Sequence, residues 1–438
     1  MRNPLDYLFP GYRWARKILK ASPHLSPWRF LWAPAPGPLE NLPEADVKRI
    51  NQSSRTYYDR EDLKDFWFRK PYSDVRWAGQ FLGRFGQLLC ALNIQSGDKI
   101  LDYGCGSGWT SIMMARMGAE VVGTDIAPAV LQIAEFSANQ TMPAPDRERV
   151  RFENFPENRI PYPDEHFDSV VIFEAYHHLP NPKTIMNEIY RVLSPNGLFV
   201  YAEPGTAHKE SELAQSEMEQ GILEQDLDLE SLYRTGMEAG FQNMEVFLPF
   251  IEPHLISLPM KRARWYLRGF SRFVPSYLIR AAILSAPAGV FIKGPHRITS
   301  LHPHSHIARI RTEMRTLIAK PDSVVKIEVE VHNPSDTVWL KNGRRGRGFV
   351  RLGAQLLDQQ LNIVNQDFGR APLKNDMTKN STMTIAIDLK APSTPGNYIV
   401  RLDMVNEGIC WFASQGSPAL EIPFLSQTGS STETAQTY

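Results

Sequence analysis

Cysteine is scarce in this sequence. The 438 residues include three cysteines, Cys90, Cys105 and Cys410, which lie far apart along the chain. So small and scattered a set cannot form a disulfide framework, and this usage favours a reducing compartment. Because 42% of the residues are hydrophobic, the chain can bury an ample core without such cross-links.

Long apolar runs are also missing. The sequence contains no uninterrupted apolar stretch of about 18 residues, the length that a membrane-spanning helix requires. Its N-terminus lacks the apolar core of about 7–15 residues that marks a signal peptide. We therefore expect a cytoplasmic protein, and its length suits two domains.

Acidic residues are absent from one long stretch. Residues 253–312 contain no Asp or Glu, and because the net charge of the whole chain is zero, the remainder carries −10. The stretch holds ten basic residues: Lys261, Arg262, Arg264, Arg268, Arg272, Arg280, Lys293, Arg297, Arg309 and Arg311. Aromatic residues such as Trp265 and Phe270 lie between them, a pattern typical of segments that bind an anionic membrane surface.

We expect residues 260–292 to hold the protein at the inner face of the cytoplasmic membrane. A packing element between two domains is the main alternative. A nucleic-acid patch is the other alternative, but we predict no nucleic-acid partner.

The most informative stretch, residues 99–126, reads KILDYGCGSGWTSIMMARMGAEVVGTDI. An apolar strand runs into Asp102, a turn with three glycines and a helical segment follow, and a second strand ends at Asp125. Strand, glycine turn, helix, strand and acid form the first half of a nucleotide-binding α/β sheet. The glycines let a ligand approach the backbone, and an acid at the tip of the second strand can accept hydrogen bonds from two ribose hydroxyls.

The glycine spacing separates two ligand classes. A dinucleotide fold normally has G-x-G-x-x-G, which turns a helix N-terminus towards a pyrophosphate. Here the pattern is G-x-G-x-G, and the preceding Asp102 would repel a phosphate but suits an ammonium or sulfonium. These residues resemble the class I S-adenosylmethionine (SAM)-dependent methyltransferases, the type 11 group in particular, and the resemblance extends over about residues 75–250. It implies a doubly wound, Rossmann-like α/β sheet and SAM as the cofactor.

The resemblance also implies a set of donor-binding residues: Asp102, Gly104, Cys105, Gly106, Gly108, Asp125, Ile126, Asn154, Phe155 and Phe173. In the family the residue at position 154 approaches the adenine, and here an amide replaces the commoner acid. Phe155 is expected to pack on the adenine ring.

Polar residues follow two later strands of the predicted sheet. Glu174 and Glu203 fall at carboxyl ends of strands, where ligands bind in such sheets, and His178 and His208 come shortly after them. Methyl transfer to a hydroxyl requires alignment of donor and acceptor and removal of a proton. We predict His178, or His208 together with Glu203, as the catalytic group, although a histidine at position 178 often packs beside the donor in this family. No metal-ligand spacing stands out in this domain, so we predict no metal.

From Ile310 the chain changes character. Short strands that alternate at period two, such as VVKIEVEVHN at 324–333, predict an antiparallel β-sandwich. This part is similar to the immunoglobulin-like modules attached to bacterial surface-polysaccharide enzymes. The predicted organisation has five parts: an irregular arm at 1–50, the methyltransferase domain at 51–250, a basic connecting segment at 251–307, the sandwich at 308–425 and a disordered tail at 426–438.

These features predict a methyltransferase that acts on a sugar hydroxyl of a bacterial surface polysaccharide or its lipid-linked precursor. The glycan follows from the resemblance of the appended sandwich and from the basic segment. One alternative is a methyltransferase for a small lipophilic metabolite such as a quinone. The other is a non-catalytic binding protein on a methyltransferase fold.

Overall fold

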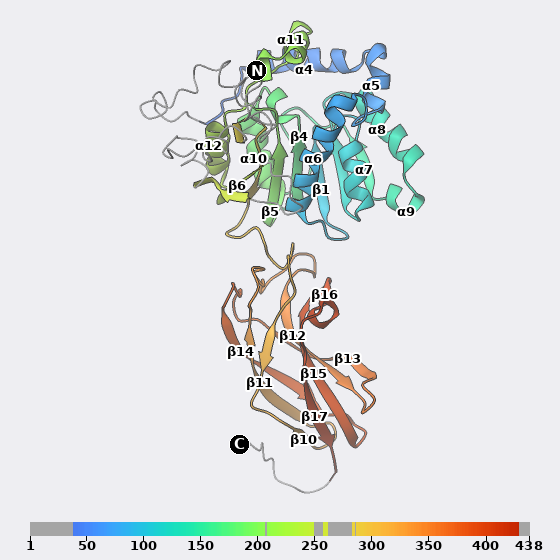
Figure 1. The fold of residues 1–438 in the computed structure, drawn as a ribbon, viewed down its shortest axis with the longest axis vertical. Helices are drawn as coiled ribbons and strands as arrows, with labels where there is room; N and C mark the ends of the chain where they lie inside the picture. Colours follow the sequence, from blue (N-terminus) through green and yellow to red (C-terminus); the bar gives the residue numbers. More distant parts are fainter. Residues whose placement is uncertain (1–37, 206–207, 249–256, 262–282, 285, 429–438) are drawn as a thin grey trace, which may run out of the picture. The chain divides into compact units, whose positions relative to one another are not determined.

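The computed structural model describes residues 38–205, 208–248, 257–261, 283–284 and 286–428 (Figure 1). The chain forms two compact units, residues 1–297 and 298–438. Most of the predicted arm, the greater part of the predicted membrane-binding segment and most of the tail lie outside the described residues. Within the described ranges, no helix combines the length and the hydrophobicity needed to cross a membrane.

Among the described residues, four helices precede the central sheet of the first unit. They are α4 (Glu44–Tyr58), η2 (Glu61–Leu63), α5 (Lys64–Phe68) and α6 (Val75–Leu92). The irregular arm was expected to continue to residue 50, but α4 begins at Glu44. Glu44 and Asp46 lie in its first turn, where negative charge favours a helix, and Val47 and Ile50 are buried.

The sheet of the first unit has the predicted doubly wound core. Its five parallel strands are β1 (Lys99–Tyr103), β2 (Glu120–Thr124), β3 (Val150–Glu153), β4 (Phe167–Phe173) and β5 (Leu193–Ala202). Their order across the sheet is β3-β2-β1-β4-β5. Every residue of β4 is buried, as expected for a strand covered by helices on both faces. Between β1 and β6 the described helices are α7 (Trp109–Arg116), α8 (Pro128–Thr141), α9 (Ala144–Arg147), η3 (Tyr176–His178), α10 (Pro182–Val192), η4 (His208–Glu210), α11 (Glu212–Glu219) and α12 (Leu229–Ala239).

The far edge of this sheet differs from the prediction. The remaining strands are β6 (Asn243–Phe247), β7 (Ser257–Pro259) and β8 (Ala288–Ile292). The sheet continues from β5 in the order β8-β6-β7, and β8 pairs antiparallel with both β5 and β6. All five residues of β8 are buried, so this apolar segment completes the sheet well beyond residue 250, where we expected the domain to end. The basic stretch before β8 is therefore an insertion between strands of one sheet rather than a linker between domains.

The second unit is a two-sheet β-sandwich, as predicted. One sheet has the order β10-β17-β15-β12-β13, with β16 paired to β15, and the other has the order β14-β11-β9. The strands are β9 (Arg309–Arg311), β10 (Leu317–Ala319), β11 (Val324–His332), β12 (Val350–Leu357), β13 (Ile363–Pro372), β14 (Thr382–Lys390), β15 (Gly396–Asn406), β16 (Cys410–Trp411) and β17 (Leu420–Ser426). The pairs are antiparallel except for β10 with β17. Trp339 and Phe412 meet edge to face in the core, with ring centroids 5.3 Å apart.

Candidate active site

The glycine turn between β1 and α7 has the geometry of a ligand-binding loop. Gly104, Gly106 and Gly108 have positive φ angles of 77°, 51° and 76°, which side chains disfavour. A Cβ added at Gly104 would lie 2.5 Å from Cβ of Ala175, whereas one at Gly106 would meet nothing within 4 Å. The turn is thus packed closely at Gly104 and open at Gly106, where a ligand can approach the backbone.

Asp102 lies beneath this turn. Its Oδ2 accepts hydrogen bonds from the hydroxyls of Thr110 and Ser111, both at 2.6 Å. Burial raises the pKa of Asp102 to about 6, and the two hydroxyls act in the opposite direction. The carboxylate therefore ties β1 to the first turn of α7. These bonds make it a support of the donor loop, and its contact with a cationic ligand stays a prediction.

Asp125 and Asn154 form the other wall of the loop. Asp125 Oδ2 accepts a hydrogen bond from the N–H of Gly106 and Oδ1 one from the N–H of Ala127, each at 3.0 Å. Each oxygen retains accepting capacity for a ribose hydroxyl. The Asn154 amide donates to the carbonyl oxygens of Asp125 (2.7 Å) and Ile126 (3.1 Å). A carboxylate could not donate these bonds, so the two backbone carbonyls explain why position 154 carries an amide.

The predicted apolar donor residues occupy two different environments. Phe155 is 7% exposed and packs on Tyr162 in the core, and its contact with an adenine stays a prediction. Phe173, at the end of β4, meets Phe85 and Trp109 at centroid distances of 5.5 Å. Cys105 is buried, and its N–H donates to the carbonyl of Thr124.

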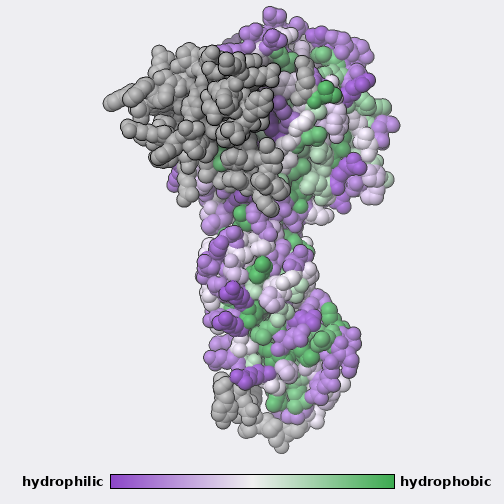
Figure 2. All heavy atoms as spheres, in the orientation of Figure 1, coloured by the Kyte–Doolittle hydropathy of each residue, from purple (hydrophilic) through white to green (hydrophobic). Residues whose placement is uncertain are grey.

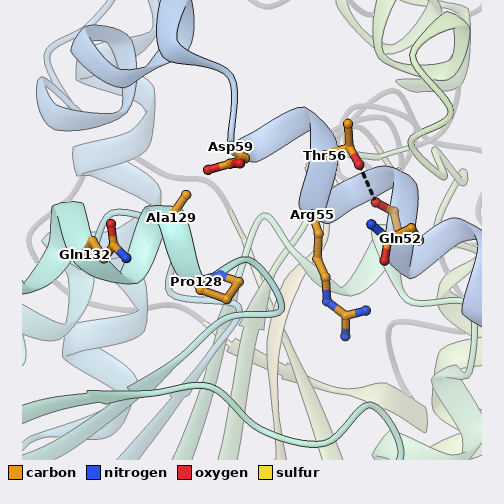
Figure 3. A pocket seen from close by; sticks show the side chains of 7 residues that line it. All are labelled: Gln52, Arg55, Thr56, Asp59, Pro128, Ala129 and Gln132. Atoms are coloured by element: carbon orange, nitrogen blue, oxygen red, sulfur yellow. Dashed lines mark hydrogen bonds between the residues drawn. The ribbon is translucent and has the colours of Figure 1, made fainter.

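A polar hollow of about 250 Å³ opens between α4 and α8 (Figure 3). Its lining residues are Gln52, Arg55, Thr56, Asp59, Pro128, Ala129 and Gln132. Arg55 pairs with Glu157 at 2.7 Å and reaches the carbonyl oxygen of Ile126 at 3.4 Å. None of the predicted donor residues lines this hollow, and the described surface around α4 is mostly hydrophilic (Figure 2). The hollow is therefore separate from the glycine turn.

Glu203, at the end of β5, is fully buried. Its Oε1 accepts the N–H groups of Ala175 (3.1 Å) and Tyr176 (2.9 Å), and its Oε2 accepts Nδ1–H of His177 at 2.6 Å. Burial raises the pKa of Glu203 to about 6, while the backbone N–H groups act to lower it. We expected this carboxylate to face an acceptor, but its bonds are made inside the fold. Its role is to orient His177 and the loop after β4.

Three imidazoles meet beside this carboxylate. His178 and His208 were alternatives in the sequence, and the structure brings both into one cluster with His177. The His178 side chain is 23% exposed and its Nδ1 donates to the carbonyl of Leu223 at 2.8 Å. The His208 side chain is 20% exposed. Burial lowers the pKa of His177 and of His178 to about 4.

Glu224 joins these imidazoles, and the sequence did not single it out. Its side chain is fully buried, with Oε2 lying 2.8 Å from Nε2 of His208 and 3.6 Å from Nε2 of His177. Its Oε1 lies 3.2 Å from Nδ1 of His178. Burial alone would raise the pKa of Glu224, but the imidazoles hold it below its usual value, and Glu224 in turn raises the pKa of His208 against the effect of burial.

A second acid and a tyrosine extend the cluster. Glu217, on α11, accepts a hydrogen bond from the hydroxyl of Tyr57 at 3.3 Å. Burial and the charge of Glu224 raise the pKa of Glu217. We predicted no metal in this domain, yet His177, His178 and Glu224 each offer a potential metal-ligand atom, all within 4.8 Å of one another.

The donor loop and the histidine cluster are direct neighbours. Ala175, whose Cβ faces Gly104, is two residues before His177. Glu174, just before it, has a φ of +54° and pairs with Arg84, whose guanidinium also donates to the carbonyl of Glu203 at 2.6 Å. A left-handed residue at a strand tip is a common sign of a functional site.

Comparisons with known proteins identify a methyltransferase domain in the chain. The family model described as a methyltransferase domain matches residues 101–201. The ubiquinone biosynthesis O-methyltransferase of Pasteurella multocida is 26% identical over 170 residues, which are 37% of this chain and 66% of that protein. The protein of the same name from Histophilus somni is 33% identical over 164 residues, 37% of this chain and 65% of that one. The chain thus spans just under two thirds of the length of these relatives.

Solved structures are similar at lower identity. A SAM-dependent methyltransferase from Mesorhizobium loti is 16% identical, covers 48% of this chain and 99% of its own, and has a TM-score of 0.35. The family match confirms a methyltransferase domain at residues 101–201, inside the stretch where the sequence predicted one.

Proposed function

We propose that this methyltransferase domain transfers the methyl group of SAM to a hydroxyl oxygen. The observation that carries this proposal is the cluster of three imidazoles and a buried carboxylate, next to the donor loop. A hydroxyl is a weak nucleophile until its proton is removed, and an imidazole held by a carboxylate is suited to that task. An acceptor that needs no proton removal would not require such a cluster.

His208 is the proposed base. Its Nε2 is held by Glu224 at 2.8 Å, and its ring is partly exposed. This pairing resembles an imidazole oriented by a buried acid, which leaves the second ring nitrogen for the substrate. His178 is the second candidate, because its Nδ1 is held by a backbone carbonyl and its Nε2 can then accept a proton,.

Two acceptor classes are proposed. The first is a sugar hydroxyl of a surface polysaccharide or its lipid-linked precursor, which the attached β-sandwich and the basic segment support. The second is a phenolic hydroxyl of a quinone precursor, which the names of the relatives support. We place the glycan first because the sandwich and the basic segment are features of this chain itself.

The test is a transfer assay with the full chain and SAM labelled in its methyl group. One set of reactions receives lipid-linked and free envelope glycans, and the other a prenylated catechol. We expect label on an oxygen atom of one set, located by mass spectrometry. Label on carbon or nitrogen alone would contradict O-methyl transfer, and label on the catechol alone would assign the acceptor to the second class.

Membrane attachment through residues 260–292, apart from the buried strand β8 at the end of this segment, is a further prediction. Each Lys or Arg near an anionic surface contributes about 1 kcal/mol, so a variant with Arg262, Arg264, Arg268 and Arg272 changed to Glu should lose co-sedimentation with anionic vesicles. Wild-type binding should weaken as salt shortens the Debye length from about 10 Å at 0.1 M to about 3 Å at 1 M. Burial of aromatic residues should leave a salt-resistant part.

A matched control reverses four exposed basic residues of the sandwich unit, Arg309, Arg311, Lys326 and Lys341. This variant should sediment with vesicles as the wild type does. A wild type that stays in solution at low salt, whatever the anionic content of the vesicles, would refute attachment and leave the segment as a packing element.

A further inference from the structure

We propose that His177, His178 and Glu224 bind a divalent transition-metal ion, such as Zn²⁺, beside the donor loop. The three residues come from two segments of the first unit, the turn η3 after β4 and the segment between α11 and α12. Their potential ligand atoms lie within 4.8 Å of one another.

The spacing of these atoms fits a shared ion. His177 Nε2 lies 3.6 Å from Glu224 Oε2, and His178 Nδ1 lies 3.2 Å from Glu224 Oε1. Nitrogen and oxygen ligands at about 2.0–2.1 Å from a tetrahedral zinc lie roughly 3.3 Å apart. The three side chains are therefore already near the positions that coordination requires.

Glu224 supplies an independent reason to expect a cation. Its carboxylate is fully buried, and its nearest described partners are His208 Nε2 at 2.8 Å and His178 Nδ1 at 3.2 Å. Burying an ionised carboxylate is costly unless it is paired. A metal ion in contact with these oxygens would compensate for that cost.

The residues around the three ligands hold them as metal ligands are commonly held. Glu203 accepts Nδ1–H of His177 at 2.6 Å, which leaves the lone pair of Nε2 for the ion,. His208 Nε2 lies 2.8 Å from Glu224 Oε2, closer than the roughly 3.3 Å between two ligands of a tetrahedral zinc, so His208 supports the carboxylate from outside. His178 would exchange its hydrogen bond to Leu223 for the metal bond.

This donor set indicates the kind of ion. Two imidazoles and one carboxylate suit zinc and neighbouring transition metals, whereas Mg²⁺ and Ca²⁺ prefer oxygen ligands. Three protein ligands leave a coordination position open, as in catalytic zinc sites. An acceptor hydroxyl could fill that position; this role rests on the proposed function, whereas binding of the ion does not.

The test is metal binding by the full chain without any acceptor. The protein is dialysed against a chelator and titrated with Zn²⁺ by calorimetry, and in parallel with Co²⁺, whose absorption bands report tetrahedral coordination. We expect one equivalent of metal, retained after desalting. Glu203→Gln should weaken binding about 10–100-fold, as for other partners of metal-bound histidines, and Glu224→Gln should weaken it at least as much.

Two control measurements distinguish loss of the metal site from loss of the fold. SAM binding by each variant shows that it is folded, and His332→Ala, on the sandwich strand β11, should bind metal as the wild type does. Wild-type protein that retains no stoichiometric metal, or folded Glu224→Gln and His177→Asn variants that bind it undiminished, would overturn the proposal. Metal binding without transfer to a hydroxyl would instead count against the proposed function alone.

Discussion

Replacing Asp125 with Ala should weaken SAM binding about 10–100-fold. The carboxylate is expected to accept two ribose hydroxyls, and hydrogen bonds to a charged group contribute about 1.5–3 kcal/mol. The same substitution removes the acceptors that fix the N–H groups of Gly106 and Ala127, so the loop loses some of its preorganisation as well. Isothermal titration calorimetry with the full chain measures the change directly.

Asp59→Ala is the matched control for this experiment. Asp59 is an exposed acid in the hollow between α4 and α8, apart from the glycine turn (Figure 3). It should bind SAM with wild-type affinity. Undiminished SAM affinity in Asp125→Ala would contradict the assignment of the donor site. A loss of SAM affinity confined to Asp59→Ala would indicate that SAM binds in the hollow instead.

Local sequence patterns predicted the first half of the sheet well. Residues 99–126 carry strand, turn and helix signals in immediate succession, and each depends on near neighbours in the chain. The open position at Gly106 and the acid at Asp125 follow from the same pattern. These elements are recognisable because the chemistry of the loop is set by residues that are close in sequence.

The parts that the sequence missed depend on contacts between distant segments. β8 is five apolar residues behind a long basic insertion, and nothing in that stretch distinguishes a sheet strand from a membrane anchor. Glu203 was correctly placed at the end of β5, but the N–H groups that surround it come from the loop after β4. Asn154 was expected to approach the adenine, but its bonds to the backbone carbonyls after β2 could not be foreseen.

Glu224 is the clearest example of a site residue that the sequence did not reveal. It lies in an acidic segment that could equally be a solvated helix start, and its imidazole partners at 177 and 178 are more than forty residues earlier in the chain. One signal was available: the neighbouring Ile222 and Leu227 are apolar, and both are buried. An acid between buried apolar residues is a candidate for a functional role, because burial of a carboxylate is costly unless it is paired.

The close packing of Gly104 on Ala175 links donor and acceptor functions. Because a Cβ at Gly104 would lie 2.5 Å from that of Ala175, the turn that holds SAM and the loop that carries His177 and His178 fix each other's position. Transfer in line requires the acceptor oxygen within about 3–3.5 Å of the methyl carbon. A cluster held against the donor loop is placed to hold an acceptor at that range.

Replacing His208 with Ala should lower kcat about 10²–10⁴-fold, the usual contribution of a general base. Its ring is partly exposed beside the donor loop and held by Glu224 at 2.8 Å, whereas none of the predicted SAM contacts involves it. SAM affinity in this variant should therefore stay within about threefold of wild type. That change is smaller than the tenfold change to which about 1.4 kcal/mol corresponds.

Steady-state kinetics that follows formation of the methylated acceptor gives kcat, and calorimetry gives the affinity for SAM. The two quantities are thus measured separately. A residue that only supported the fold would change donor affinity and thermal stability along with turnover. His178→Ala, measured in parallel, decides between the two imidazoles: the true base is the one whose loss lowers kcat while donor affinity is kept. If both variants kept turnover within a few-fold of wild type, proton removal would have to occur elsewhere or the acceptor would need none.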